Sequence, residues 1–245
     1  MHRFYLPPPA FSEDQPLLSP EESHHAAIVL RLEVGQKITV FDGTGFEAPA
    51  TLLEISRGAV RVAVGQRQKS PALPCAITLA QAVPKGKNME LIVQKAVELG
   101  ATRIAPIISD RTISRWTAEE AQEKTRKWQS VAIEACKQCG QNVVPEVCLP
   151  RPMKEFLEKT PLAELPLIAS LQPDARHLKH WLGEIPGGRR PASVTILVGP
   201  EGDFTPAETG AAKSAGYRPV TLGPIILRTE TAAIYCLSVL AHECF

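Results

Sequence analysis

The stretch TILVGPEGDFTPAE, residues 195–208, decides the fold. Residues 195–198 have the short, apolar and β-branched composition of a buried parallel strand. The sequence GPEG follows directly and ends regular structure, because Gly allows sharp turns and Pro lacks a backbone donor. Glu201 lies between the two glycines, on otherwise bare backbone. A strand that runs into such a turn has the layout of a ligand loop.

A helix is expected after this turn. Thr205 is predicted as its N-cap, Pro206 as its first residue and Glu208 as the capping-box partner. Thr and Glu three residues apart can satisfy each other's backbone N–H groups, so we assign these three residues to structure.

The stretch VTLGPIILRTETAAIY, residues 220–235, repeats the design. A strand over residues 220–222 leads into Gly223 and Pro224, and a helix is expected over Arg228–Leu240. Three aliphatic residues, Ile225 to Leu227, lie between turn and helix. Because loops are normally polar, these three aliphatic residues indicate either a pocket wall or packing under the sheet.

Strand-like and helix-like segments alternate from residue 76 onward, which predicts an α/β fold with a largely parallel sheet covered on both faces. The expected strands are Ala76–Ala80, Arg103–Ile108, Asn142–Cys148, Leu167–Ser170, Ser193–Val198 and Arg218–Leu222. The expected helices before the last one begin at Met89, Ala118, Met153, Arg176 and Pro206.

Ligands of open parallel sheets bind outside the carboxyl ends of the strands. Lys85 and Lys87 follow the first expected strand, Arg111 follows the second, and Leu171 follows the fourth. The GPEG and GPIILRTE segments follow the last two strands. We therefore expect glycine-rich segments and a basic rim that accepts phosphates to meet at one edge.

Residues 1–70 are predicted to be a small β-barrel domain, and residues 71–245 the α/β domain. The expected strands are Lys37–Phe41, Glu47–Ile55 and Ala59–Val64, with turns at Asp42-Gly43 and Arg57-Gly58 and a short helix after Ser19. The sequence QKSPALP, residues 68–74, fits a linker.

Composition limits the function classes. The chain has 245 residues and a net charge of +1, so bulk electrostatics give no support for a nucleic-acid partner. The six cysteines include one CxxC pair, Cys136 and Cys139, inside a helix-like segment, which argues against zinc or redox chemistry. The start MHRFYLPPPA lacks an apolar signal core, and no apolar run approaches the roughly 18 residues of a membrane span. A cytoplasmic protein without membrane or metal is expected.

Long motifs in a fixed order resemble one known family. GPEGDFTPAE and LGPIILRTETA look like the two signature loops of the RsmE-type 16S ribosomal RNA uridine N3-methyltransferases of the SPOUT class. The resemblance extends to HHAAIVLRLEVGQKITVFDGTG, KGKNMELIVQKAVELGATRIAPIIS and IEACKQCGQ. It implies a SPOUT-type parallel sheet with a C-terminal trefoil knot, a PUA-like β-barrel, and a homodimer. It also implies methylation, with S-adenosyl-L-methionine, of uridine 1498 in the 16S rRNA of the small ribosomal subunit.

The resemblance carries site residues over position by position. The cofactor would be held by Leu171, Gly199, Glu201, Leu222, Gly223, Ile226, Leu227, Arg228 and Thr229. The first domain would hold RNA, with Arg3, His25 and Arg31 as candidate contacts beside the basic rim of Lys85, Lys87 and Arg111. Lys95 and Glu98 become candidates near the active site or the dimer contact, although a solvated or structural helix face is the favoured explanation for them. The chain departs from the family at Gln141-Asn142, where an arginine is typical.

Methylation at uridine N3 needs a base to remove its proton and a cation to stabilise charge on O2 and O4. Arg228 is the expected cation, because guanidinium stays charged at any working pH. Glu201 and Glu230 are both candidates for the base, and Glu230 has the alternative role of stabilising the helix dipole. Two rivals remain: a non-catalytic ribosomal-RNA-binding protein, and a phosphate-handling enzyme that uses GPEG as an anion loop.

Overall fold

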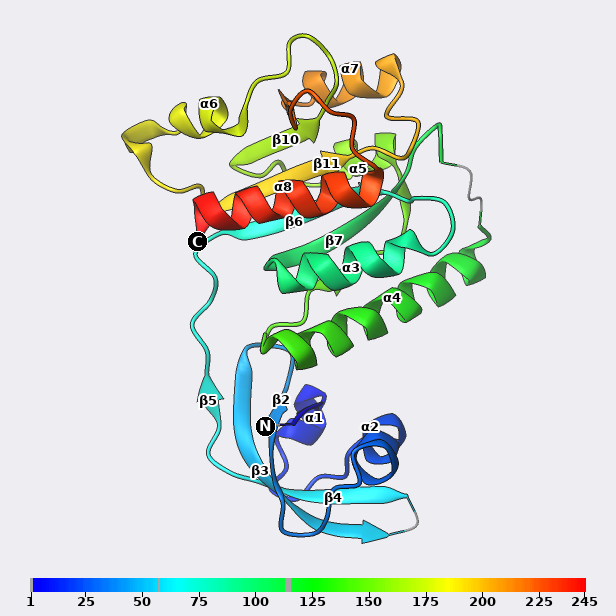
Figure 1. The fold of residues 1–245 in the computed structure, drawn as a ribbon, viewed down its shortest axis with the longest axis vertical. Helices are drawn as coiled ribbons and strands as arrows, with labels where there is room; N and C mark the ends of the chain where they lie inside the picture. The colour runs from blue at the N-terminus through cyan, green and yellow to red at the C-terminus, as the bar shows by residue number, and fades with distance from the viewer. Residues whose placement is uncertain (1, 57, 113–115) are drawn as a thin grey trace. The chain divides into compact units, whose positions relative to one another are not determined.

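The computed structural model describes residues 2–56, 58–112 and 116–245, which form two compact units (Figure 1). The first unit holds the residues up to Ala72 together with Ile133–Val144, and the second holds Leu73–Ala132 and Pro145–Phe245. The boundary between Ala132 and Ile133 falls inside the long helix α4 (Ala118–Cys139). The domain assignment 1–70 and 71–245 stays a prediction, and residues 133–144 are the segment on which it differs from these units.

A curled five-stranded sheet forms the first unit. Its strand order is β1-β2-β3-β4, β5 pairs with β3, and every pairing is antiparallel except β1 with β2. The strands are β1 (Arg3–Tyr5), β2 (Lys37–Phe41), β3 (Phe46–Ser56), β4 (Ala59–Val64) and β5 (Gln68–Lys69). Strand β1 was not predicted, and β5 lies in the segment that was predicted to be a linker. The predicted turn residue Arg57 lies outside the described residues.

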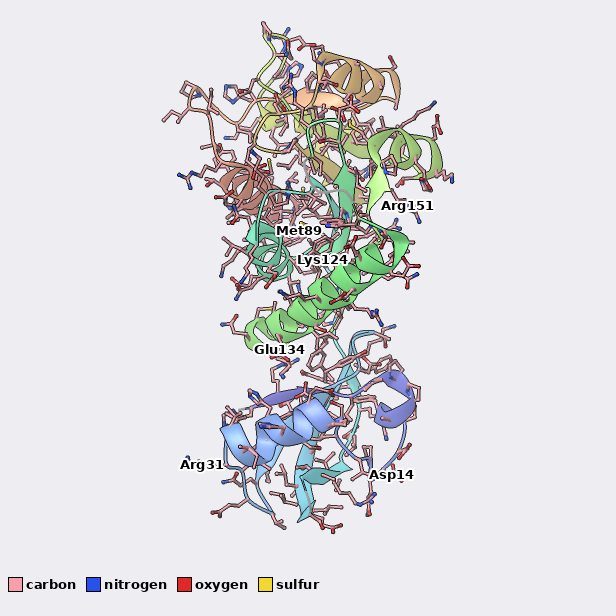
Figure 2. All side chains as sticks on the ribbon, turned by 90° about the vertical axis from the view of Figure 1, so that its right-hand side faces the viewer. Asp14, Arg31, Met89, Lys124, Glu134 and Arg151 are labelled. Carbon is pink, nitrogen blue, oxygen red and sulfur yellow. The ribbon has the colours of Figure 1, made fainter. Side chains whose placement is uncertain are left out.

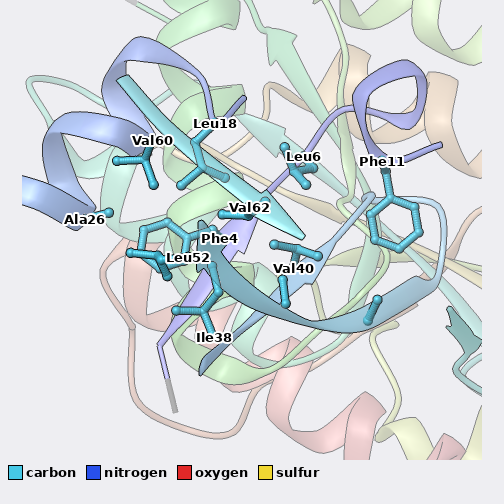
Figure 3. Packing of buried hydrophobic residues seen from close by; sticks show 12 residues of the cluster. Phe4, Leu6, Phe11, Leu18, Ala26, Ile38, Val40, Leu52, Val60 and Val62 are labelled. Carbon is cyan, nitrogen blue, oxygen red and sulfur yellow. The ribbon is translucent and has the colours of Figure 1, made fainter. Parts of the chain in front are cut away.

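The first unit has its own apolar core between the sheet and short helices. Phe4, Leu52 and Val62 are fully buried in a cluster that Figure 3 shows from close by. The helices are α1 (Pro8–Phe11), α2 (Pro20–His24) and the π-helical turn η1 (His25–Val29). Ser19 caps α2, since its side chain accepts a hydrogen bond from the backbone N–H of Glu22 at 3.2 Å.

The segment Ile133–Val144 belongs to the first unit through a buried ion pair and a backbone bridge. Lys137 Nζ lies 3.0 Å from Glu22 Oε1, and both side chains are at most 10% exposed. Val143 bridges to Gly43 and Thr44. These contacts explain why the strand expected over Asn142–Cys148 is reduced to two residues.

A seven-stranded sheet is the frame of the second unit, with the order β12-β10-β11-β6-β7-β8 and β9 paired to β7. All its pairings are parallel, as the alternating pattern predicted. The strands are β6 (Ala76–Ala82), β7 (Ala101–Ile108), β8 (Glu146–Val147), β9 (Arg151–Pro152), β10 (Leu165–Ala169), β11 (Ser193–Val198) and β12 (Arg218–Val220). The trefoil knot stays a prediction, because strand order alone does not decide it.

Helices cover both faces of this sheet. On one face α3 and α8 lie side by side, and on the other face α5 and α7 pack together (Figure 1). The helices and turns are α3 (Asn88–Glu98), α5 (Met153–Lys159), α6 (Leu178–Gly183), the 3-10 turn η2 (Pro186–Gly188), α7 (Pro206–Ser214) and α8 (Thr229–Cys244). Residues of β6 alternate between the faces: Ala80 and Ala82 belong to the α5–α7 core. Met89 begins the buried face of α3, and Figure 2 labels it.

The predicted capping box of α7 is confirmed. Thr205 Oγ1 accepts from Glu208 N at 3.2 Å, and Glu208 Oε2 accepts from Thr205 N at 2.8 Å. Glu208 is buried, and its Oε1 also accepts from the backbone N–H of Asp110 at 2.9 Å. The same carboxylate therefore starts α7 and ties the loop after β7 to it.

Candidate active site

A hollow of about 590 Å³, open to solvent, lies at the carboxyl ends of β10, β11 and β12 and the start of α8. Eight of the nine residues predicted to hold the cofactor line it: Leu171, Gly199, Glu201, Leu222, Gly223, Ile226, Leu227 and Thr229. The ninth, Arg228, is exposed at its edge as the N-cap residue of α8. The two stretches quoted from the sequence therefore meet in one hollow.

The loop GPEG, residues 199–202, forms one side of the hollow and is tied to two neighbouring loops. Glu201 Oε1 accepts a hydrogen bond from the backbone N–H of Lys85 at 2.9 Å. The Arg111 guanidinium donates to the carbonyl of Gly202. These contacts reach the loops that follow β6 and β7, so the backbone of the GPEG loop is fixed from both sides.

Asp203 continues this loop in a left-handed conformation, with φ +61. Its N–H donates to the carbonyl of Pro200 at 2.9 Å, and its Oδ1 accepts from the N–H of Phe204 at 2.8 Å. A Cβ on Gly199 would lie only 2.9 Å from that Oδ1. A side chain at position 199 would therefore have to displace the Asp203 carboxylate and press against the backbone of Asp203 and Phe204.

The other side of the hollow is the loop PIIL, residues 224–227. Gly223 enters it with φ +108, which L side chains rarely adopt. Ile225 is 73% exposed and Ile226 is 77% exposed, and both line the hollow together with Leu171, which is 60% exposed. The aliphatic residues are thus a pocket wall and not part of the core, which decides the alternative that the sequence left open.

The three residues predicted for the chemistry take different positions. Glu201 lines the hollow, whereas Glu230 lies in the first turn of α8 and is not among the lining residues. Arg228 has an exposed side chain, and no carboxylate among the described residues pairs with it. A guanidinium without a protein counter-ion is available to an anionic group of a ligand.

Two of the three rim cations contact the GPEG loop. Lys85 does so through its backbone, Arg111 does so through its side chain, and both are exposed. Lys87 is exposed directly before α3. Three basic residues therefore follow the strands β6 and β7 at the edge where the hollow opens.

The candidate RNA contacts of the first unit differ from one another. The Arg3 side chain is only 16% exposed; its Nη1 lies 2.9 Å from Glu47 Oε2, and its guanidinium lies over the Phe41 ring. His25 is half-buried against Phe4, with ring centroids 6.1 Å apart. Arg31 is exposed just after η1 (Figure 2). Arg31 is thus the candidate whose charge reaches solvent most freely, while Arg3 is already paired within its own unit.

A neighbouring hollow of about 670 Å³ lies along β12, α6 and α8 and shares Leu222 with the first. Its lining is mainly the middle of helices and strands, including Ile196, Tyr235 and Val239. No glycine is among its lining residues, whereas Gly199 and Gly223 line the first hollow. We therefore place the chemistry in the hollow at the strand ends.

Two buried cysteines, Cys136 and Cys236, have a structural character. Burial raises the pKa of the Cys136 and Cys236 thiols to about 12, so both stay protonated near neutral pH. Within the described residues, no group of three His, Cys, Asp or Glu side chains is placed to bind a metal. In that same part of the chain, no helix is both long and apolar enough to cross a membrane.

Two lining residues, Ser170 and Asp203, are absent from the predicted site. Asp203 had a usable signal, because an acid next to a turn glycine often adopts a left-handed backbone. Ser170 had none, since a serine at a strand end is common.

Two family models match this chain. Residues 71–241 match the RNA methyltransferase domain, and residues 18–64 match the RNA methyltransferase PUA domain. Together the matches include the hollow, both loops around it and most of the curled sheet.

Individual proteins are similar over most of their length. The Ribosomal RNA small subunit methyltransferase E of Bacillus subtilis is 31% identical over 91% of this chain and 88% of its own. The crystal structure of the Neisseria gonorrhoeae protein of that name, bound to S-adenosyl methionine, superposes with a TM-score of 0.87 at 34% identity, covering 99% of this chain and 97% of that one. A Legionella pneumophila protein solved with its bound cofactor SAM gives a TM-score of 0.90 at 34% identity, with the same coverage.

Proposed function

Because the chain belongs to the RNA methyltransferase family, we propose that it methylates N3 of a uridine in the 16S rRNA of the small ribosomal subunit, with S-adenosylmethionine as methyl donor. The observation that carries the proposal is the meeting of the GPEG and PIIL loops in one hollow. Similar chains were crystallised with this cofactor, which supports the identity of the ligand.

The residues of the hollow fit this cofactor. Adenine is flat and has polar edges, so it suits a slot with aliphatic walls and backbone donors and acceptors. Leu171 and Ile226 supply the exposed aliphatic surface, and the turns at Gly199 and Gly223 bring bare backbone close to it. S-adenosylmethionine supplies a methyl group on a cationic sulfur, and the loops align that methyl with the base to be altered.

The acid–base roles follow from the positions of the charged residues. Glu201 is our candidate for the base, since it lines the hollow and the N–H of Lys85 holds its carboxylate in place. Arg228 is our candidate for stabilising charge on the uridine oxygens, because it lies beside the hollow with its donors free of any carboxylate in the described chain. Glu230 then stabilises the N-terminus of α8.

The RNA would reach the hollow across the basic rim. Lys85, Lys87 and Arg111 offer charges for phosphate groups, and the first unit, through Arg31 and His25, offers further contacts. A net charge of +1 means that such local groups must provide the attraction. A homodimer and a cytoplasmic location complete the proposal.

The test is methyl transfer itself. The protein is incubated with labelled S-adenosylmethionine and small subunits that lack the modification, and the labelled nucleotide is mapped. Label at N3 of one 16S uridine is expected. Saturable cofactor binding without label on any RNA would contradict the proposed substrate. Absence of cofactor binding in calorimetry, with RNA binding retained, would favour the non-catalytic RNA-binding protein.

A further inference from the structure

Gln81 is a fully buried amide inside strand β6, whose other residues are apolar except Thr78. It shares a sheet face with Ile77 and Leu79, two residues apart along the strand, and that face is covered by α8. A buried amide is costly unless its polar atoms are bonded. The free-energy cost of burying Gln81 therefore suggests that its amide has a role that an aliphatic side chain could not fill.

The Gln81 amide group donates two hydrogen bonds, but its oxygen accepts none from the described residues. Its Nε2 donates to the carbonyl of Ala82 at 2.8 Å and to Thr229 Oγ1 at 3.0 Å. Its Oε1 has no partner among the described residues. The reverse orientation would set the oxygen against the Ala82 carbonyl, which cannot donate, so the amide is locked as a donor.

Thr229 links Gln81 to the GPEG loop. Its hydroxyl donates its one proton to the carbonyl of Gly199 at 2.7 Å, so toward Gln81 the Thr229 oxygen can only accept. Thr229 is 4% exposed and is the first residue of α8. The directions of both hydrogen bonds are therefore fixed by chemistry.

We propose that Gln81 is a positioning residue for methyl transfer: through Thr229 it holds the start of α8, and with it Arg228, in register with the GPEG loop. The N-cap residue Arg228 makes no side-chain cap of its own, so the Thr229 hydroxyl is the side-chain contact that fixes the helix start to the loop. Gly199 and Thr229 both line the hollow, and a shift between them would separate the cofactor from the guanidinium. This role rests on the proposed function.

The first test is a double-mutant cycle on the full chain, with Gln81→Met, Thr229→Val and the pair. Each single change is expected to lower the single-turnover methylation rate at saturating cofactor about 10- to 100-fold. The pair is expected to match the worse single variant, because both changes cut one relay. Thr229→Ser keeps the hydroxyl and is expected to retain most of the rate. Additive losses, or an undiminished rate in Gln81→Met, would overturn the proposal.

A matched control separates positioning from stability. Ile77→Val removes one buried methylene from the same face of β6 without touching the relay. It is expected to lower the melting temperature and leave the methylation rate unchanged. If Ile77→Val and Gln81→Met lost rate in proportion to stability, Gln81 would be an ordinary core residue and the proposal would fail.

A second readout does not depend on the reaction. The N–H of Ala232 donates to the carbonyl of Arg228 at 2.8 Å in the first turn of α8. Gln81→Met is expected to speed hydrogen exchange about tenfold at this turn and to leave the last turn unchanged. If the wild-type chain methylates no RNA, the proposed function fails, while this exchange difference still decides the relay. Unchanged exchange at Ala232 would overturn it.

Discussion

The GPEG loop and the PIIL loop face each other across one hollow, yet the rest of the chain holds them very differently. The first is tied by the Lys85 N–H, the Arg111 guanidinium and the Asp203 turn. The second presents Ile225 and Ile226 with about three quarters of their surface exposed. One side is thus a fixed polar frame, and the other is apolar surface that gains its packing when a ligand covers it.

The difference indicates a division of labour. Groups that must be aligned within fractions of an ångström for methyl transfer belong on the tied side. Groups that only need to cover an apolar ring can remain on the loosely held side, because apolar contact is not directional. Substitutions on each side can test this difference, because cofactor affinity, methylation rate and stability should respond differently to them.

The largest effect is expected from Gly199→Val on the tied side. Its Cβ would lie 2.9 Å from Asp203 Oδ1, so the turn must move. Cofactor affinity, measured by calorimetry, is expected to fall at least about 100-fold while circular dichroism stays unchanged. Gly210→Ala is the control, because an added methyl on α7 meets no atom within 4 Å. It should keep full affinity and gain roughly 0.5–1 kcal/mol of stability. Wild-type affinity in Gly199→Val would refute the cofactor assignment.

Arg228→Ala comes next. Arg228 is an exposed residue between the lining residues Leu227 and Thr229 and is not in the lining itself, so its loss is expected to reduce the methylation rate about 100-fold and cofactor affinity less than about threefold. Arg228→Lys keeps the positive charge but loses the planar guanidinium, so its methylation rate should lie between those of the wild type and Arg228→Ala. Single-turnover rates and calorimetry measure the two quantities. Equal losses in rate and affinity would show that Arg228 binds the cofactor instead.

Arg111→Ala tests whether the basic rim both binds RNA phosphates and supports the GPEG loop. Loss of a phosphate contact is expected to weaken binding to the small subunit about five- to tenfold and to lower the salt slope by about one. Lys87→Ala, an exposed rim cation with no side-chain ion pair in the described chain, should lower that slope equally. Only Arg111→Ala also frees the Gly202 carbonyl, so it alone should weaken cofactor binding, by about threefold. Identical cofactor affinities in both variants would show that the hydrogen bond from Arg111 to the Gly202 carbonyl does not support cofactor binding.

The smallest effect is expected on the loosely held side. Ile226→Ala removes apolar surface that only a ligand covers, so cofactor affinity should fall about threefold, while the free energy of unfolding changes by less than about 0.5 kcal/mol. Ile28→Ala is the matched control, an exposed isoleucine of the first unit at 62%. It should change neither quantity. A large loss of stability in Ile226→Ala would mean that the PIIL loop packs as core in solution.

Local chemistry predicted much of the fold. The strands Lys37–Phe41, Ala59–Val64 and Ser193–Val198 have the bounds expected from alternating or continuous apolar runs. The start of α7 was predicted because a capping box is readable from two residues. Elements that depend on distant partners were missed: β1 and β5 have few residues and exist only through pairing with β2 and β3.

The sequence by itself determined the alternation of strands and helices and the two glycine-bearing loops, because propensity, capping and turn chemistry act over a few neighbours. Its resemblance to a known family supplied most of the predicted residues that line the hollow. Only the tertiary structure decided that Ile225 and Ile226 are a wall, that Arg3 is neutralised by Glu47, and that Gln81 reaches Thr229. Those facts depend on contacts between residues far apart in the chain, whose partners no local pattern names.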